Sequence, residues 1–241
     1  MVIREAGDFS SILQQNGFEV LNLPLIRTEP LEDLAELKRE LRTLDQYDGL
    51  FFTSPVSAEI FLNNLGEAAR FNGKVYVLGE RTNACFAKTD LELVFLRQAN
   101  TAEEFIMSFD KTEFSEKKFL FVRGEKSLRT IPDLLASVAI VDEVNVYRTL
   151  ANEISDEIHL AIREKIESHE IDWICFFSPS GIDAFLSLFP SDAVKSINTG
   201  VIGDTTAKRA TETKFNVRLI SETANAKDFA INLTKYVNKI D

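Results

Sequence analysis

The chain contains one structural unit twice. Residues 48–62 read DGLFFTSPVSAEIFL, and residues 172–186, which lie 124 positions later, read DWICFFSPSGIDAFL. The same offset aligns VLGERT at residues 77–82 with VIGDTT at residues 201–206, and Ala102 and Phe105 with Ala226 and Phe229. Three matches at one offset, without a gap, indicate an internal duplication. With 241 residues, the chain has room for two domains that each bury a core.

Apolar runs of strand length alternate with segments of helical period, which is typical of parallel sheets covered by helices. We therefore predict an α/β protein with two flavodoxin-like parallel-sheet domains, each of five strands. The expected strands are Val2–Arg4, Phe18–Leu23, Leu50–Phe52, Val75–Leu78, Glu92–Leu96, Phe119–Val122, Ile140–Val144, Trp173–Phe177, Thr199–Ile202 and Val217–Ile220.

The order of the pieces predicts that one domain is inserted in the other. Ile3-Arg4 and Val122-Arg123 both precede a helix and one more strand, but only the first pair lies at the amino end of the chain. The chain would cross twice between the domains, and two adjacent linkers form a hinge with a cleft. The predicted parts are domain 1 at residues 1–23 and 151–241, domain 2 at residues 28–144, and linkers at residues 24–27 and 145–150.

Both copies of the unit place hydroxyl groups where a strand ends and a helix begins. Ser54 and Ser178 each precede a proline, so the serine can cap a helix that starts at the proline. Strand-end turns of open α/β sheets gather at the ligand-binding edge, and helix N-termini bind anions. For any single turn, the start of a helix explains the Ser or Thr residue as well as ligand binding does. The candidate binding residues are Thr53, Ser54, Thr82, Ser178, Ser180, Gly181, Thr205 and Thr206.

One tyrosine and three arginines complete the candidate site. Tyr147 lies in the expected returning linker, where its ring either packs against both domains or presents its phenol to the cleft as a weak acid. Arg4, Arg123 and Arg148 are candidate anchors for carboxylates, although each could equally form a surface ion pair of little consequence.

Several motifs of known chemistry are absent from the sequence. There is no GxGxxG after a strand, no P-loop, no GxSxG and no HExxH, so we expect neither a cofactor nor a metal. His159 and His169 are the two histidines, and we expect both to be solvated. Cys85 and Cys175 stand far apart in apolar segments, which predicts reduced core residues of a cytoplasmic protein.

The charge balance disfavours a nucleic-acid partner. The formal net charge is −11 and no run of Lys or Arg is present, whereas binding to nucleic acid requires neutralisation of phosphates. A few arginines and helix N-termini can still form a local site for a small anion. No signal peptide or membrane-spanning segment is visible, so we expect a soluble protein that binds no membrane.

The ordered set of motifs resembles the uroporphyrinogen-III synthase family over nearly the whole chain. FFSPSG at residues 176–181 and IGDTTA at residues 202–207 are the most specific parts. The other matching parts are Arg4, Asn16-Gly17, LPLI at residues 23–26, FTSP at residues 52–55, residues 77–82, residues 121–135 with Arg123-Gly124, and residues 146–149.

The resemblance implies an enzyme, a cyclising hydro-lyase that converts hydroxymethylbilane into uroporphyrinogen III. Water is lost, the ring closes, and the last pyrrole ring is inverted through a spiro intermediate, without a cofactor. The family's linker tyrosine, thought to assist departure of the hydroxyl group, corresponds to Tyr147. The family's cleft-lining turns correspond to Thr53, Ser54, Ser178, Ser180, Gly181, Thr205 and Thr206. The resemblance also implies a monomer, with possible transient contact with the preceding enzyme of the pathway.

Two departures and two rival functions accompany this resemblance. The first strand has only about four residues up to Arg4, which is shorter than the family's usual opening. Glu80-Arg81 follows Gly79, where the family more usually has small residues. The main rival is a non-enzymatic two-domain protein that closes on a small anionic ligand. A glycosyl or phosphoryl transferase is a second rival, but the expected nucleotide and metal motifs are missing.

Overall fold

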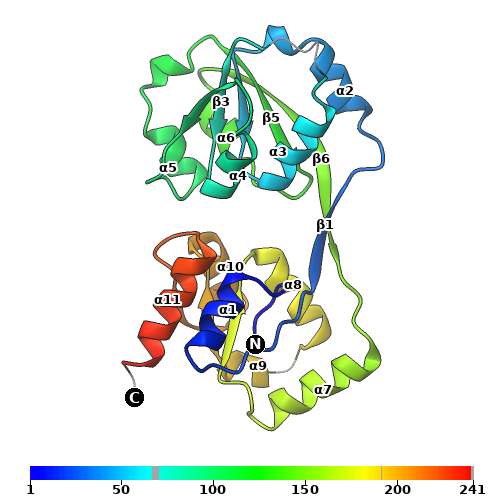
Figure 1. Cartoon of the computed structure of the whole chain (residues 1–241), viewed down its shortest axis with the longest axis vertical. Coiled ribbons are helices and arrows are strands. Elements are labelled where there is room, and N and C mark those ends of the chain that lie inside the picture. Colours follow the sequence, from blue (N-terminus) through cyan, green and yellow to red (C-terminus); the bar gives the residue numbers. More distant parts are fainter. Residues whose placement is uncertain (67–70, 191, 240–241) are drawn as a thin grey trace. The chain divides into compact units, whose positions relative to one another are not determined.

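The computed structural model describes residues 1–66, 71–190 and 192–239. The chain divides into two compact units, which we describe separately: unit 1 comprises Met1–Arg27 with Leu150–Asp241, and unit 2 comprises Thr28–Thr149. The boundaries fall inside two strands, β1 (Ile26–Pro30) and β6 (Ile140–Ala151), which are hydrogen-bonded neighbours (Figure 1). Tyr147 therefore lies in a strand and not in an irregular linker.

Unit 2 is built on a parallel sheet. Its strands lie side by side in the order β6-β5-β2-β3-β4, and all four neighbouring pairs are parallel. The strands besides β6 are β2 (Gly49–Phe52), β3 (Lys74–Val77), β4 (Glu92–Phe95) and β5 (Lys118–Gly124). The helical segments are α2 (Ala35–Arg42), η1 (Leu44–Gln46), α3 (Pro55–Asn64), α4 (Glu80–Cys85), α5 (Ala102–Met107), η2 (Lys111–Glu113) and α6 (Thr130–Leu135).

Unit 1 has a smaller parallel sheet. Strands β7 (Trp173–Phe176), β8 (Asn198–Val201) and β9 (Asn216–Ile220) lie in that order. Val2 forms parallel bridges to Cys175 of β7 and to Asn22. The helices are α1 (Asp8–Gln15), α7 (Asp156–Glu167), α8 (Pro179–Leu188), α9 (Ala193–Ser196), α10 (Asp204–Glu212) and α11 (Ala226–Val237).

Both units place corresponding segments in the same spatial order. In unit 1 the order is Asn22, Val2, β7, β8, β9, which is the flavodoxin order 2-1-3-4-5 in chain sequence. Unit 2 has the same arrangement, but its chain starts at the strand that corresponds to β7. The predicted α/β class with parallel sheets is confirmed. The expected strands Val2–Arg4 and Phe18–Leu23 are wrong as regular strands, because each contributes only isolated bridges.

The duplication extends to the pairing of individual residues. β2 pairs with β3 from Gly49 opposite Lys74, and β7 pairs with β8 from Trp173 opposite Asn198. Each residue of the second pair stands 124 positions after its counterpart, as in the sequence repeat. The two units therefore share one pairing register.

Central strands of the sheets are apolar on both faces because helices cover both sides. All four residues of β2 are buried. Phe52 packs with Phe61 of α3 on one face, while Phe51 joins Tyr76 and Phe119 in an aromatic cluster on the other. In unit 1 the two faces are likewise separate cores, one around Phe176 and Phe185 and one around Phe9, Cys175 and Phe229.

Side chains cap the starts of two further helices, α5 and α11. Thr101 accepts a hydrogen bond from the Glu104 N–H and the Glu104 carboxylate accepts from the Thr101 N–H, which completes a capping box. Asn225 accepts from the N–H groups of Lys227 and Asp228 at the start of α11. These caps hold the last helix of each copy after its outer strand.

We predict that Gly49→Ala destabilises the protein by about 1–3 kcal/mol, because overpacking a filled core forces side chains to move. A Cβ at residue 49 would lie 2.8 Å from the Phe119 ring and 2.9 Å from Tyr76. The matched control is Gly66→Ala, whose Cβ meets no heavy atom within 4 Å and should change stability by less than about 0.5 kcal/mol. Urea denaturation measures both; equal stabilities of the two variants would contradict the packing argument.

Candidate functional site

In unit 2, the turn between β2 and α3 presents hydroxyl groups at a helix N-terminus. Ser54 is the N-cap residue, in extended conformation, and Pro55 starts the helix as predicted. The Ser54 side chain makes no capping hydrogen bond, and its carbonyl oxygen accepts from the Ser57 hydroxyl at 2.9 Å. Thr53 and Ser54 are both half-buried. Because the first N–H groups of a helix lack intrahelical acceptors, this turn can bind an anion.

The corresponding turn in unit 1 has the same shape but different hydrogen bonds. The Ser178 hydroxyl accepts from the Gly181 N–H at 3.1 Å and lies 3.0 Å from the Ser180 hydroxyl. Gly181 is buried, and a Cβ at this position would lie 3.7 Å from Ile3. The predicted residues Ser178, Ser180 and Gly181 are therefore together, but the Ser178 hydroxyl already caps its own helix.

The second pair of turns starts α4 and α10. Neither N-cap, Gly79 or Gly203, can supply a side-chain cap, and Gly79 has φ 89°, a left-handed conformation that favours glycine. Thr82 and Thr206 correspond to each other and are buried, whereas Thr205 is exposed. Of these three predicted residues, only Thr205 presents its side chain to solvent in the unit to which it belongs.

Arg4 and Arg123 occupy corresponding places in the two units, but they have different environments. Arg4 lies over the Phe177 ring, 4.4 Å from its centroid, next to the turn that starts α8. Arg123 is only 7 % exposed and donates to the Glu143 carboxylate and the Ser127 carbonyl. To bind a ligand carboxylate, Arg123 would have to leave Glu143, which costs about 3–5 kcal/mol for a buried pair.

Tyr147 is positioned by a glycine on the neighbouring strand. It pairs with Gly124 of β5, at a point where the register of the two strands shifts, and its carbonyl accepts from the Glu125 N–H at 3.0 Å. A Cβ at residue 124 would lie 2.5 Å from the Tyr147 ring, so only glycine leaves room for it. Tyr147 is half-buried, and within the described residues its hydroxyl makes no hydrogen bond. The ring is thus held in place against Gly124.

The remaining candidates have local structural partners. Arg148 donates to the Glu29 carboxylate from Nε and Nη2 at 2.9 and 2.8 Å, and this hydrogen bond raises the pKa of Arg148. The prediction for His159 is wrong, because its ring stacks on Phe189 and its Nε2 lies 3.0 Å from the Leu188 carbonyl oxygen. Burial raises the pKa of the Cys175 thiol to about 12, as expected for an unreactive core cysteine.

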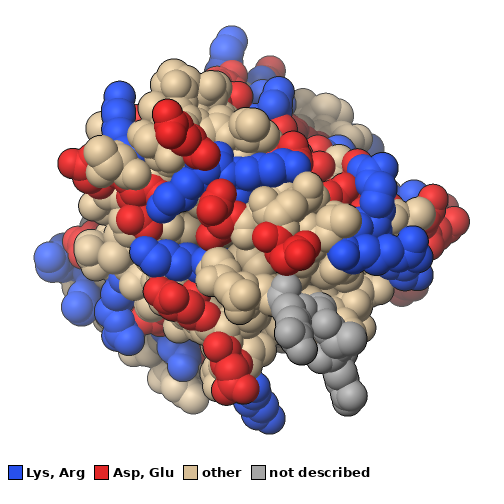
Figure 2. Space-filling model, turned by 90° about the horizontal axis from the view of Figure 1, so that it is seen from above, with Lys and Arg blue, Asp and Glu red and all other residues tan. Residues whose placement is uncertain are grey.

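Acidic and basic side chains are interspersed over the face of the molecule shown in Figure 2. Among the described residues, no group of three or more His, Cys, Asp or Glu side chains could hold a metal ion. No helix in the described part of the chain is long and apolar enough to cross a membrane.

A model of the family described as uroporphyrinogen-III synthase HemD matches residues 7–230. The chain belongs to this family. A uroporphyrinogen-III synthase from Chlorobaculum parvum is 27 % identical over 234 residues, which cover 94 % of this chain and 92 % of that protein. A chloroplastic uroporphyrinogen-III synthase from Oryza sativa subsp. japonica is 24 % identical and covers 91 % of this chain and 74 % of its own length.

Solved structures of the uroporphyrinogen-III synthase family share the fold. A mutant uroporphyrinogen III synthase from Thermus thermophilus aligns with a TM-score of 0.64 at 17 % identity, over 96 % of this chain and 94 % of that one. A uroporphyrinogen-III synthetase from Helicobacter pylori 26695 aligns with a TM-score of 0.57, also at 17 % identity, over 90 % and 92 % of the two chains. The resemblance noted from the sequence is therefore confirmed.

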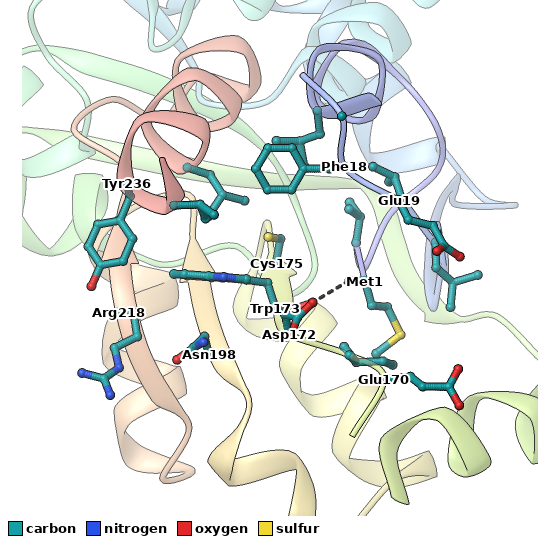
Figure 3. A pocket seen from close by; sticks show the side chains of 18 of the residues that line it. Met1, Phe18, Glu19, Glu170, Asp172, Trp173, Cys175, Asn198, Arg218 and Tyr236 are labelled. Carbon is teal, nitrogen blue, oxygen red and sulfur yellow. Dashed lines mark hydrogen bonds between the residues drawn. The ribbon is translucent and has the colours of Figure 1, made fainter. Parts of the chain in front are cut away.

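Sequence analysis missed one feature of unit 1, a large groove at the opposite ends of the strands from these turns. It is lined by Met1, Phe18, Asp172, Trp173 and Tyr236, among others (Figure 3). In the sequence, the match of Asp172 with Asp48 in the repeat was the one sign of this region, and it does not indicate a groove by itself.

We predict that Ser178→Ala lowers stability by about 1 kcal/mol, because a capping hydrogen bond is lost. The matched variant, Ser54→Ala at the equivalent position, removes no capping bond and should change stability by less than about 0.5 kcal/mol. Guanidinium denaturation of both proteins tests the difference. If Ser54→Ala proved the more destabilising change, the assignment of the two hydroxyl groups would be wrong.

Proposed function

We propose that this protein catalyses the cyclisation of hydroxymethylbilane to uroporphyrinogen III, with loss of water and inversion of the last pyrrole ring. The main observation that supports this function is the family match over residues 7–230, which includes both copies of the Ser-Pro turn. Membership of the family makes the chain a cyclising lyase of porphyrin biosynthesis, as predicted. The alternative of a non-enzymatic binding protein finds no support among the relatives.

The substrate is a linear tetrapyrrole that carries acetate and propionate groups, so binding requires several anion sites. In our proposal its carboxylates lie at the N-termini of α3 and α8. Thr53, Ser54, Ser180 and Thr205 donate hydrogen bonds, and Arg4 supplies positive charge. Hydrogen bonds to charged groups contribute about 1.5–3 kcal/mol each, so a few of them hold the polyanion.

The remaining predicted residues act through the shape of the turns. Thr82 and Thr206 are buried in the first turns of α4 and α10, where they support the exposed backbone N–H groups. Gly181 lets the start of α8 approach Ile3, which is next to Arg4. Arg123 is held by Glu143 and Ser127, so we propose that it fixes the end of β5 next to Gly124 and Tyr147.

Tyr147 assists the departure of water. A hydroxyl group leaves more readily when a proton or hydrogen bond is supplied to its oxygen, and a phenol is a weak acid that can do this. The fixed position of the Tyr147 ring against Gly124 supports this role, as does a hydroxyl without a partner among the described residues. No stronger acid is required, because the substrate is reactive and closes by itself to the uninverted isomer.

The enzyme's main task in this proposal is therefore to select a conformation. Holding the reacting ends of the chain in one geometry favours the inverted ring through orientation, without strong general acids or bases. Two sets of anion-binding turns, supplied by duplicated units, can hold the two ends of a flexible polyanion separately.

We further propose that the protein works as a cytoplasmic monomer. It would take its substrate by transient contact with the preceding enzyme of the pathway. The support is chemical, since hydroxymethylbilane that remains free in solution closes to the wrong isomer, and a short transfer limits this loss.

The decisive experiment is an isomer assay. Purified protein is mixed with freshly made hydroxymethylbilane, and the products are oxidised and separated by chromatography. We expect the type III isomer to dominate over type I, because the enzyme outcompetes spontaneous closure. A product mixture identical to that of the protein-free control would refute the proposed function.

We predict that Tyr147→Phe lowers kcat by at least about tenfold while KM and the melting temperature stay unchanged, because the hydroxyl has no protein partner among the described residues. The matched control is Tyr236→Phe, which removes the same atom from a tyrosine of unit 1 that lies beside Trp173. Steady-state assays and thermal unfolding measure both variants. Full activity of Tyr147→Phe would reduce Tyr147 to a packing residue.

A further inference from the structure

Strand β6 contains one extra residue immediately before Tyr147. In the sheet of unit 2, β6 lies beside β5 (Figure 1). Arg123 of β5 pairs with Asn145, but the next residue, Gly124, pairs with Tyr147. Val146 is therefore the extra residue of a β-bulge. Bulges are frequent next to active sites, where they change the direction of a side chain.

The bulge decides on which face of the sheet the Tyr147 ring lies. Consecutive side chains of a regular strand point to opposite faces. Val144 and Val146 belong to one core cluster of unit 2, and Tyr147 packs against the same cluster although it directly follows Val146. Its ring lies beside Gly124, where a Cβ would be 2.5 Å away. Without the bulge, the phenol would point to the other face.

The Glu143 carboxylate connects two arginines next to this bulge. Its Oε2 accepts from Nη1 of Arg123, which directly precedes Gly124. Its Oε1 accepts from Nε of Arg129 at 3.0 Å and lies 2.7 Å from Nη2 of the same side chain. Glu143 therefore joins the two residues that flank the loop of residues 124–128.

Hydrogen bonds also tie this loop to itself and to β6. The Ser127 N–H donates to the Gly124 carbonyl at 3.0 Å, and the Gly124 N–H donates to the Ser127 hydroxyl at 3.1 Å. Nη2 of Arg123 donates to the Ser127 carbonyl. The Glu125 N–H donates to the Tyr147 carbonyl at 3.0 Å. The loop thus bonds both to the arginine and to the backbone of the tyrosine.

The ion pair of Glu143 with Arg123 is the strong part of this arrangement. The side chain of Arg123 is 7 % exposed and that of Glu143 is 22 % exposed, whereas that of Arg129 is 62 % exposed. Loss of one partner from a buried ion pair leaves an uncompensated charge, while an exposed pair contributes little. Among the described residues, Nε of Arg123 has no hydrogen-bond partner, so this guanidinium depends on Glu143 and Ser127.

The ion pair and the Tyr147 ring lie on opposite faces of the sheet. Arg123 lies over the Phe121 ring, 5.6 Å from its centroid. Phe121 belongs to the core cluster on the face opposite to Val146 and the Tyr147 ring. Any effect of the ion pair on the phenol therefore passes through the backbone of β5 and β6.

We propose that Glu143 is a positioning residue for the cyclisation. By holding Arg123 and Arg129 it fixes residues 124–128, and the fixed loop maintains the bulge that directs the Tyr147 phenol. Glu143 need not touch the substrate for this effect. The inference rests on the proposed function and on the role of Tyr147 in it.

The first test follows the loop itself and does not use the activity. NMR-detected hydrogen exchange reports on the amides of Gly124 and Glu125, whose protection is lost when the loop opens. We expect Glu143→Gln to accelerate the exchange of both amides at least about tenfold, because the neutral amide no longer balances the charge of Arg123.

The matched control is Glu113→Gln. The Glu113 carboxylate also accepts from two side chains, from Lys74 Nζ at 2.8 Å and from the Tyr76 hydroxyl at 2.7 Å, and it is 28 % exposed. It lies in η2, before the start of β5 and so at the amino edge of the sheet. This variant should keep the exchange of both loop amides within about twofold. Equal acceleration by the two variants would contradict the proposal.

The second test is a double-mutant cycle between Glu143 and Tyr147. We expect Glu143→Gln to lower kcat for the type III isomer at least about fivefold and to change KM by less than about twofold, since the anion-binding turns are unaltered. In the Tyr147→Phe background the same change should lower kcat by less than about twofold, because the hydroxyl that it positions is already absent. A purely structural role would lower kcat equally in both backgrounds and would overturn the proposal.

Arg129→Gln tests the same coupling if Glu143→Gln does not fold. The exposed Arg129 side chain can be replaced without disturbing the pair of Glu143 with Arg123. We expect kcat to fall about two- to threefold in the otherwise unaltered protein and to stay unchanged in the Tyr147→Phe background. The same loss in both backgrounds would count against the proposal.

The unaltered protein separates this inference from the proposed function. If it forms no type III isomer, the cyclase function fails and the positioning role falls with it. If it is active but the double-mutant cycle shows no coupling, only the role of Glu143 is refuted.

Discussion

Parallel pairing of a central strand is the interaction on which both units depend. β2 pairs with β3 and β5, and β7 pairs with β8 and bridges to Val2. Strands β2 to β6 in unit 2, and β7 to β9 in unit 1, therefore each have their carboxyl ends at one edge. Helices begin immediately after those ends, so their exposed N–H groups and hydroxyl side chains gather at that edge. The gathering of these donor groups at one edge thus follows from the direction of the strands, in a chain whose net charge is −11.

The two copies of the unit have diverged in how they use the same positions. Ser178 caps its own helix, whereas the Ser54 side chain makes no capping bond. Arg123 is held by Glu143, whereas Arg4 lies over an aromatic ring. Duplication therefore supplies two similar sets of turns, in which corresponding side chains have different partners.

Much of this architecture was predictable because it depends on local patterns. Alternation of strand-length and helix-length apolar runs predicted the α/β class, and the 124-residue offset predicted equivalent turns at Ser54 and Ser178. The family resemblance predicted the activity. Sequence analysis failed where a feature depends on a distant neighbour. Val2–Arg4 has the composition of a strand but forms only bridges, and His159 has a polar setting in sequence but stacks on Phe189.

Tyr147 shows which features the sequence determines and which depend on the tertiary structure. The sequence alone determined that a tyrosine follows Val146, and that repeated Ser-Pro turns begin helices, because these are properties of neighbouring residues. Only the tertiary structure decided that Gly124 of another strand makes room for the Tyr147 ring, that Arg123 is committed to Glu143, and that the Met1 amine donates to the Trp173 carbonyl. The physical reason is that periodicity and capping are local along the chain, whereas steric room and hydrogen-bond partners come from strands that the fold brings together.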